Sequence, residues 1–128
     1  MKSSFDILDA LYALIDIPSV RDVITGKIYS GDMPDISQEE NITIKTLNNP
    51  NRYLQVGFIN LNIYCKEISS GRPNMARLKE LINIIIPLVE DVKTGPYTFQ
   101  IDDDKGIFKD QELDSMYFYN LKIKFQTI

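Results

Sequence analysis

The 128 residues are the length of a single domain, and a chain of this size can bury a core without disulfide or metal crosslinks. Its apolar content of 44% and charged content of 25% are ordinary for a globular protein, while its net charge of −4 argues against a dedicated nucleic-acid binder. The sequence contains no histidine and one cysteine, which excludes Ser-His, Cys-His and His–metal sites and an internal disulfide bond.

The chain lacks the sequence signs of a membrane or secreted protein. Its longest apolar run, residues 84–89, is far shorter than the roughly 20 residues needed to cross a bilayer. Asp6 and Asp9 interrupt the stretch where a signal peptide would need an apolar segment. A single cysteine is typical of a reducing compartment. We therefore expect a cytoplasmic protein without a membrane partner.

The first 50 residues predict one helix and two strands. The helix begins after Ser3 or Ser4, either of which can cap it, and ends before Pro18. Residues 24–29 and 42–47 predict short strands. The apolar stripe of the helix consists of Phe5, Leu8, Leu11, Tyr12 and Ile15.

The rest of the chain predicts a second helix between longer strands. Residues 54–66, 97–101 and 116–125 alternate as strands, and the acidic residues 102–106 predict a turn. The helix begins after Asn74 and runs to residue 89, with a kink or break expected at Pro87. Its core-facing stripe consists of Met75, Leu78, Leu81, Ile82, Ile85 and Val89.

Strands that cluster on either side of a long helix indicate an α+β fold. We expect one domain over residues 1–128, built on an antiparallel or mixed sheet of four to six strands. The N-terminal helix and the longer central helix are expected to pack on one face of this sheet. The opposite face then meets water or a partner.

The two longest strands have an apolar face and a mixed face. The mixed face of residues 54–66 carries amides between two aromatic rings, and that of residues 116–125 also carries lysines. Aromatic residues and Met are enriched in interfaces, so this face is a candidate contact patch. The alternative is a second small core, covered by the first helix or by residues 30–41. The candidate residues are Phe58, Asn60, Asn62, Tyr64, Met116, Phe118 and Asn120.

The sequence gives little support for a catalytic, metal-binding or cofactor-binding site. Aligning Gly106 with the invariant glycine of a calcium loop puts Ile101 and Lys105 at ligand positions, where neither can bind calcium. Cys65 lacks a histidine base and reads as a small buried apolar residue. No phosphate-binding loop has the required spacing. We therefore expect no catalytic residue, no metal and no cofactor.

An acidic segment gives the chain its net charge. Residues 102–114 contain six acids and two lysines, a balance of −4 that equals the net charge of the whole chain. The segment is expected to form an acidic loop that steers a basic partner or repels nucleic acid, or simply a solvated loop. Its candidate residues are Asp102, Asp103, Asp104, Asp110 and Glu112.

The element order and several segments resemble the tail terminator (tail completion) proteins of long-tailed bacteriophages and prophages. The likeness runs from the N-terminal helix through residues 26–34, 42–47, 58–64 and 74–89 to the final strand. It implies an α+β subunit that assembles as a ring, expected to be a hexamer, on the end of the tail tube. The implied partners are further copies, the tail tube protein and the head-completion protein, with DNA passing through the ring without specific binding. The implied locations are the bacterial cytoplasm during assembly and the virion tail.

A ring requires two different patches on each subunit. The mixed sheet face can supply one, and the loop around Met33 and Pro34 the other. Three alternatives remain open. They are another head–tail connector protein, a cytoplasmic adaptor or inhibitor that binds a different protein, and an enzyme that uses carboxylates or tyrosine in a cleft.

Overall fold

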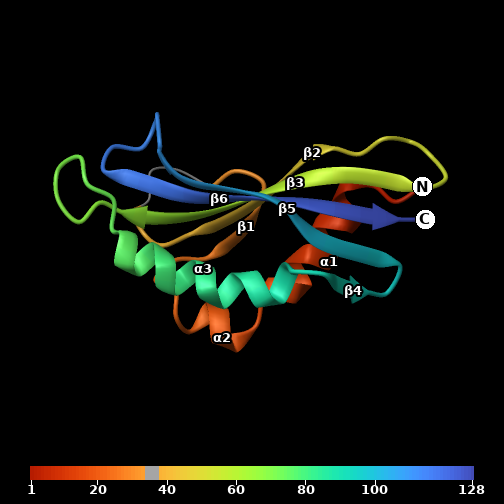
Figure 1. Ribbon diagram of the computed structural model, residues 1–128, viewed down its shortest axis with the longest axis horizontal. Coiled ribbons are helices and arrows are strands. Elements are labelled where there is room, and N and C mark those ends of the chain that lie inside the picture. The colour runs from red at the N-terminus through yellow and green to blue at the C-terminus, as the bar shows by residue number, and fades with distance from the viewer. Residues whose placement is uncertain (34–37) are drawn as a thin grey trace.

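A mixed sheet with helices on one face makes up the described parts of the chain, residues 1–33 and 38–128, in this computed structural model (Figure 1). The six strands lie in the order β1-β2-β3-β6-β5-β4. β1 and β2 are parallel and the other neighbours are antiparallel. The expected α+β class and mixed sheet are confirmed. The strands are β1 (Ile28–Ser30), β2 (Ile42–Asn48), β3 (Gln55–Lys66), β4 (Val92–Thr94), β5 (Tyr97–Lys109) and β6 (Met116–Thr127).

Helix α1 (Ser4–Ile15) begins at a capping box, in which Ser3 Oγ accepts from the Asp6 amide and Asp6 accepts from the Ser3 amide. Its buried side consists of Ile7, Leu8, Leu11 and Ile15. The predicted stripe is wrong at Phe5, whose side chain is 80% exposed. Phe5 precedes Ile7 by two residues, about 200° around the helix, so the two point to opposite sides.

The short helix α2 (Pro18–Arg21) was not expected from the sequence. Pro18 stops α1 but also starts α2, because proline fits the first helical position, where its missing N–H is not needed. The predicted strand at residues 24–29 is correspondingly displaced. It forms only from Ile28, where β1 pairs with β2.

Helix α3 (Met75–Val89) is capped by Asn74, whose side chain accepts from the Arg77 amide at 3.2 Å. The break expected at Pro87 does not occur. Proline lies in the last turn, where it costs one hydrogen bond, and the Glu90 amide still reaches the Ile86 carbonyl at 3.0 Å. Apart from the exposed Met75, the predicted stripe is buried.

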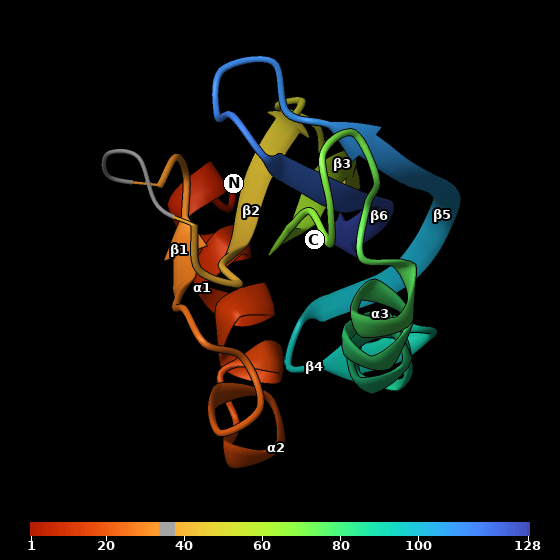
Figure 2. The same ribbon diagram turned by 90° about the vertical axis from the view of Figure 1, so that its left-hand side faces the viewer.

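The main core lies between the sheet and the helices, with α1 and α3 packed on the same face (Figure 2). Along β3 the side chains alternate, so that Ile59, Leu61 and Ile63 are fully buried while their neighbours are partly exposed. Gln55 is also fully buried, because its side chain exchanges hydrogen bonds of 2.7 and 3.0 Å with the backbone of Lys2. This pairing fastens the N-terminus to the sheet.

The expected acidic turn at residues 102–106 is wrong. β5 continues through it to Lys109, with two shifts of register against β6 that accommodate the extra residues as bulges. Gly106 lies at one of them with a φ of 81°, which favours glycine. The true β5–β6 connection is residues 110–115, where Asp110 Oδ1 accepts from two backbone amides at 2.8 Å.

Candidate functional site

The sheet surface opposite the helices, here called the open face, gathers most of the predicted contact residues. The β3–β6 register pairs Asn60 with Lys122, Asn62 with Asn120, and Tyr64 with Phe118. Paired residues lie on the same side of a sheet, so two segments that are 54 or more residues apart in the chain form one surface. Phe58 lies on the same face, opposite Lys124.

The end of this face near the β5–β6 connection is aromatic. The rings of Tyr64 and Phe118 are 5.4 Å apart, and those of Phe108 and Phe118 are 5.7 Å apart. Phe108 is 45% exposed and pairs with Phe118 in the sheet. We did not predict Phe108, because its segment was assigned to an acidic loop. Continuing the alternation of residues 97–101 forwards would have placed Phe108 on the face of Thr98 and Gln100, because the two bulges of β5 together shift the register by two residues.

One predicted contact residue, Met116, is not available on the surface. Met116 is fully buried, because the β5–β6 connection folds back on it: the Asp110 amide donates to the Met116 carbonyl, and the Met116 amide donates to Leu113. Met33 is partly exposed next to Asp32, which forms an ion pair of 2.6 Å with Lys45. Pro34 lies outside the described residues.

Asn120 is the centre of a small polar cluster on the open face. Its amide nitrogen donates to the side-chain oxygens of Asn62 at 2.6 Å and Asn60 at 3.2 Å. It is only 5% exposed, and its own amide oxygen has no hydrogen-bond partner in the described part of the chain. An open hollow of about 380 Å³ adjoins the cluster. It is lined by Leu47, Asn60, Lys105, Phe108, Phe118, Asn120 and Lys122.

Charges surround this hollow. The Lys122 ammonium lies 4.3 Å from the centre of the Phe58 ring and 3.7 Å from Asp102. Lys105 pairs with Asp103 at 3.5 Å. Two residues of the predicted acidic loop are therefore strand residues that partly neutralise lysines of the open face, and Glu112 stands apart in the β5–β6 connection.

Asp104 differs from its two neighbours because it lies beside a groove on the helical side of the sheet. The groove, here called the α3–β5 groove, has a volume of about 430 Å³. Asp104 accepts a 2.6 Å hydrogen bond from the Tyr119 hydroxyl at its edge. The apolar residues of the lining are Met75, Ala76, Leu78, Ile82, Ile86 and Ile107.

Burial of the ring, followed by the hydrogen bond to Asp104, raises the pKa of Tyr119 to about 12. The folded protein holds this phenol proton more tightly than the unfolded chain, where tyrosine titrates near pH 10. The resulting stabilisation is complete below about pH 10 and is lost as the pH rises to about 12. We expect Tyr119→Phe to remove the last component of the tyrosinate absorbance titration and to flatten the fall in stability across this range. Tyr53→Phe, on the exposed β2–β3 hairpin, should leave that component in place.

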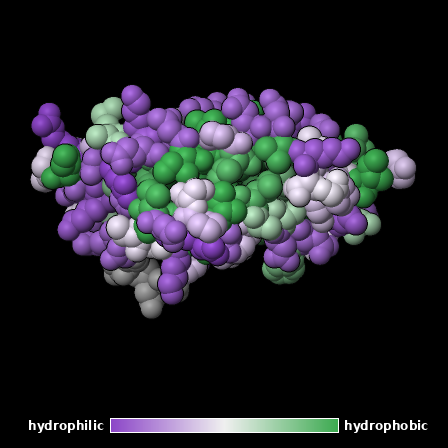
Figure 3. Space-filling view, turned by 90° about the horizontal axis from the view of Figure 1, so that it is seen from below, coloured by the Kyte–Doolittle hydropathy of each residue, from purple (hydrophilic) through white to green (hydrophobic). Residues whose placement is uncertain are grey.

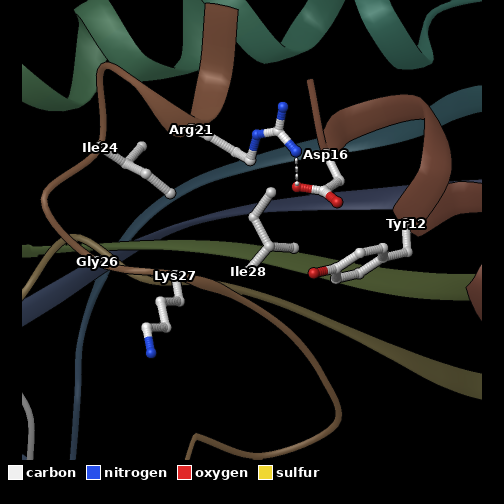
Figure 4. A pocket seen from close by; sticks show the side chains of 7 residues that line it. All are labelled: Tyr12, Asp16, Arg21, Ile24, Gly26, Lys27 and Ile28. Carbon is white, nitrogen blue, oxygen red and sulfur yellow. Dashed lines mark hydrogen bonds and ion pairs between the residues drawn. The ribbon is translucent and has the colours of Figure 1, made fainter. Parts of the chain in front are cut away.

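A smaller pocket of about 230 Å³ lies between α1, α2 and β1 (Figure 4). Asp16, which caps the end of α1, and Arg21, the last residue of α2, are 3.5 Å apart and pair with each other. The Lys27 side chain points away from this pair, and the Tyr12 hydroxyl points toward Ile28. The charged side chains of Asp16 and Arg21 therefore pair with each other, and they are not directed at a common substrate position.

Other chemically reactive groups are scattered or covered. Burial raises the pKa of the Cys65 thiol, which disfavours the nucleophilic thiolate. Within residues 1–33 and 38–128, no three cysteine, aspartate or glutamate side chains form a group that could hold a metal ion. None of the helices in these ranges is long and apolar enough to cross a membrane.

Comparison with models of known protein families and with curated protein sequences gives no match.

Proposed function

We propose that this chain is a structural subunit of a phage or prophage tail, which assembles as a ring on the end of the tail tube, stops its growth and presents a surface for the head. The observation that carries the proposal is the open face. It brings Tyr64, Phe118 and Phe108 into one partly exposed aromatic row on a sheet whose other face packs the main core against the helices. The resemblance of the chain to tail terminator proteins supports the same function.

The shape of the open face suits binding to a folded protein surface. Two aromatic rings, those of Phe108 and Phe118, line the hollow beside the polar cluster of Asn120. A binding partner that supplied an apolar side chain would fill this hollow and cover the two rings. Aromatic contacts within a polar rim are typical of protein interfaces.

The proposal is tested by adding the purified chain to polymerising tail tubes and measuring tube length and end occupancy by electron microscopy. We expect rings at tube ends and shorter tubes. Phe108→Ser should weaken ring formation at least about tenfold, the usual effect of losing an interface anchor. Tyr53→Ser is the matched control, because Tyr53 is 85% exposed on a hairpin away from the open face.

Three outcomes contradict the proposal. If wild-type protein leaves the tubes uncapped and their length unchanged, the chain is not a terminator. If it forms instead a stable one-to-one complex with a different host or phage protein, and Phe108→Ser abolishes that complex, the open face belongs to an adaptor or inhibitor. Rings that bind the head side but not the tube would indicate another head–tail connector.

A further inference from the structure

The open face and the helical side of the molecule carry opposite charge. The strands of the open face carry five lysines and two aspartates, and Asp32 pairs with Lys45 from the adjoining segment, which leaves a balance of +2 in a chain whose net charge is −4. Lys124 takes part in no ion pair with a described residue. The charged residues counted are Lys45, Lys66, Lys105, Lys122, Lys124, Asp32, Asp102 and Asp103.

The helical side is acidic. The segments 3–22 and 74–91, which contain the three helices and their caps, hold seven acids and three bases, a balance of −4. Five of these acids have exposed side chains and form no ion pair with a base of the same segment. They are Asp6, Asp9, Asp22, Glu90 and Asp91.

The helical side also carries an apolar band. Seen from this side, hydrophobic side chains run along the middle of the molecule between polar margins (Figure 3). The α3–β5 groove contributes to it, with Met75 65% exposed at one end and Ile86 partly exposed further along α3. α3 therefore has apolar residues on its outer side as well as toward the core.

We propose that the open face of one copy binds the α3 side of the next copy, front to back. This inference rests on the proposed function and names the two surfaces that would form the ring. The positive open face meets the negative helical side, and the aromatic row meets the apolar band. Because the two surfaces differ, the contact is heterologous, and repetition produces a closed ring if the rotation between copies allows it. Charge complementarity orients the copies, so assembly weakens as salt rises.

The test uses two variants that change exposed or partly exposed residues only. The open-face variant carries Phe108→Ser and Lys124→Glu, and the helical-side variant carries Met75→Ser and Glu90→Lys. Each keeps the surface that the other lacks. We expect neither to assemble alone, and an equimolar mixture to form a one-to-one dimer that grows no further. The mass of the assemblies is measured in solution at high protein concentration. If free wild-type protein is monomeric, assembly is measured on tube ends instead. Circular dichroism checks that both variants are folded.

The outcomes separate this inference from the proposed function. If wild-type protein caps tubes as a ring but both variants still assemble, or if the mixture stays monomeric, the front-to-back contact is wrong and the terminator function stands. If only the open-face variant loses assembly, open faces pair with each other and the α3 side is not used. If wild-type protein forms no ring on tubes, the proposed function fails and this inference fails with it.

Discussion

Replacing Gly57 by alanine is expected to lower the free energy of unfolding by about 3 kcal/mol, the upper part of the usual range for an overpacked core. Gly57 lies in the middle of the sheet, opposite Phe125 on β6. A Cβ atom there would collide with the Asn48 carbonyl oxygen and would lie 2.6 Å from Cζ of the Phe125 ring. The backbone oxygen belongs to the β2–β3 pairing and cannot move away cheaply. Urea denaturation of both proteins measures the difference.

A double-mutant cycle locates the cause of this loss. Phe125→Leu removes the ring from one side of the clash, so Gly57→Ala should cost less in that background than in the wild type. Val56→Ala is the neighbouring control, on the other face of the same strand, and should cost no more than about 1 kcal/mol. Equal costs for Gly57→Ala in the two backgrounds would show that Phe125 does not restrict this position.

Replacing Arg77 by methionine is expected to lower the free energy of unfolding by about 2 to 3 kcal/mol. This is somewhat below the usual value for a fully buried ion pair, because the Arg77 side chain is 25% exposed. Its guanidinium holds both oxygens of Glu40, at 2.6 and 2.7 Å, and donates to the Val23 carbonyl at 2.6 Å. Glu40 is only 12% exposed, so the substitution leaves its carboxylate covered and without this bidentate partner. Glu40 also accepts from the Thr25 amide, which extends the effect to the segment before β1.

Two further substitutions test this explanation by thermal denaturation. Arg77→Lys keeps the charge but loses the two parallel hydrogen bonds, so it should recover only part of the loss. Adding Glu40→Gln to Arg77→Met should also recover part, because the buried charge is removed. Lys79→Met, at an exposed position on the same helix, should change stability by less than about 0.5 kcal/mol. A loss at Lys79 as large as that at Arg77 would point to a general effect of charge on α3.

The sequence predicts the parts of the fold that depend on short-range patterns. The alternation of β3 and the Asn74 cap of α3 are reproduced, because each depends on residues within a few positions. The Arg77–Glu40 pair joins positions 37 residues apart and has no local signature. The same limit applies to Met116, which faces the expected side but is covered by a connection whose path the sequence did not reveal.

The prediction of the candidate site was limited mainly by β5. Three consecutive aspartates followed by Lys-Gly have the composition of a turn, and turn residues are also those that bulges accept. Assigning them to a loop hid the strand that completes the open face, and with it Phe108 and Lys105. Whether the open face binds copies of the chain or another protein depends on partners that no intrachain pattern encodes.

The bulged strand β5 also has a consequence for how copies can associate. β4 pairs only with its first three residues, so beyond Phe99 the outer backbone of β5 is not paired with any described strand. A long regular edge of this kind is the usual template for uncontrolled cross-β stacking. Two kinks interrupt the regular edge of β5, and three adjacent negative charges repel a second copy of it. Crowded copies should therefore resist fibril growth even where their broad surfaces remain free to associate.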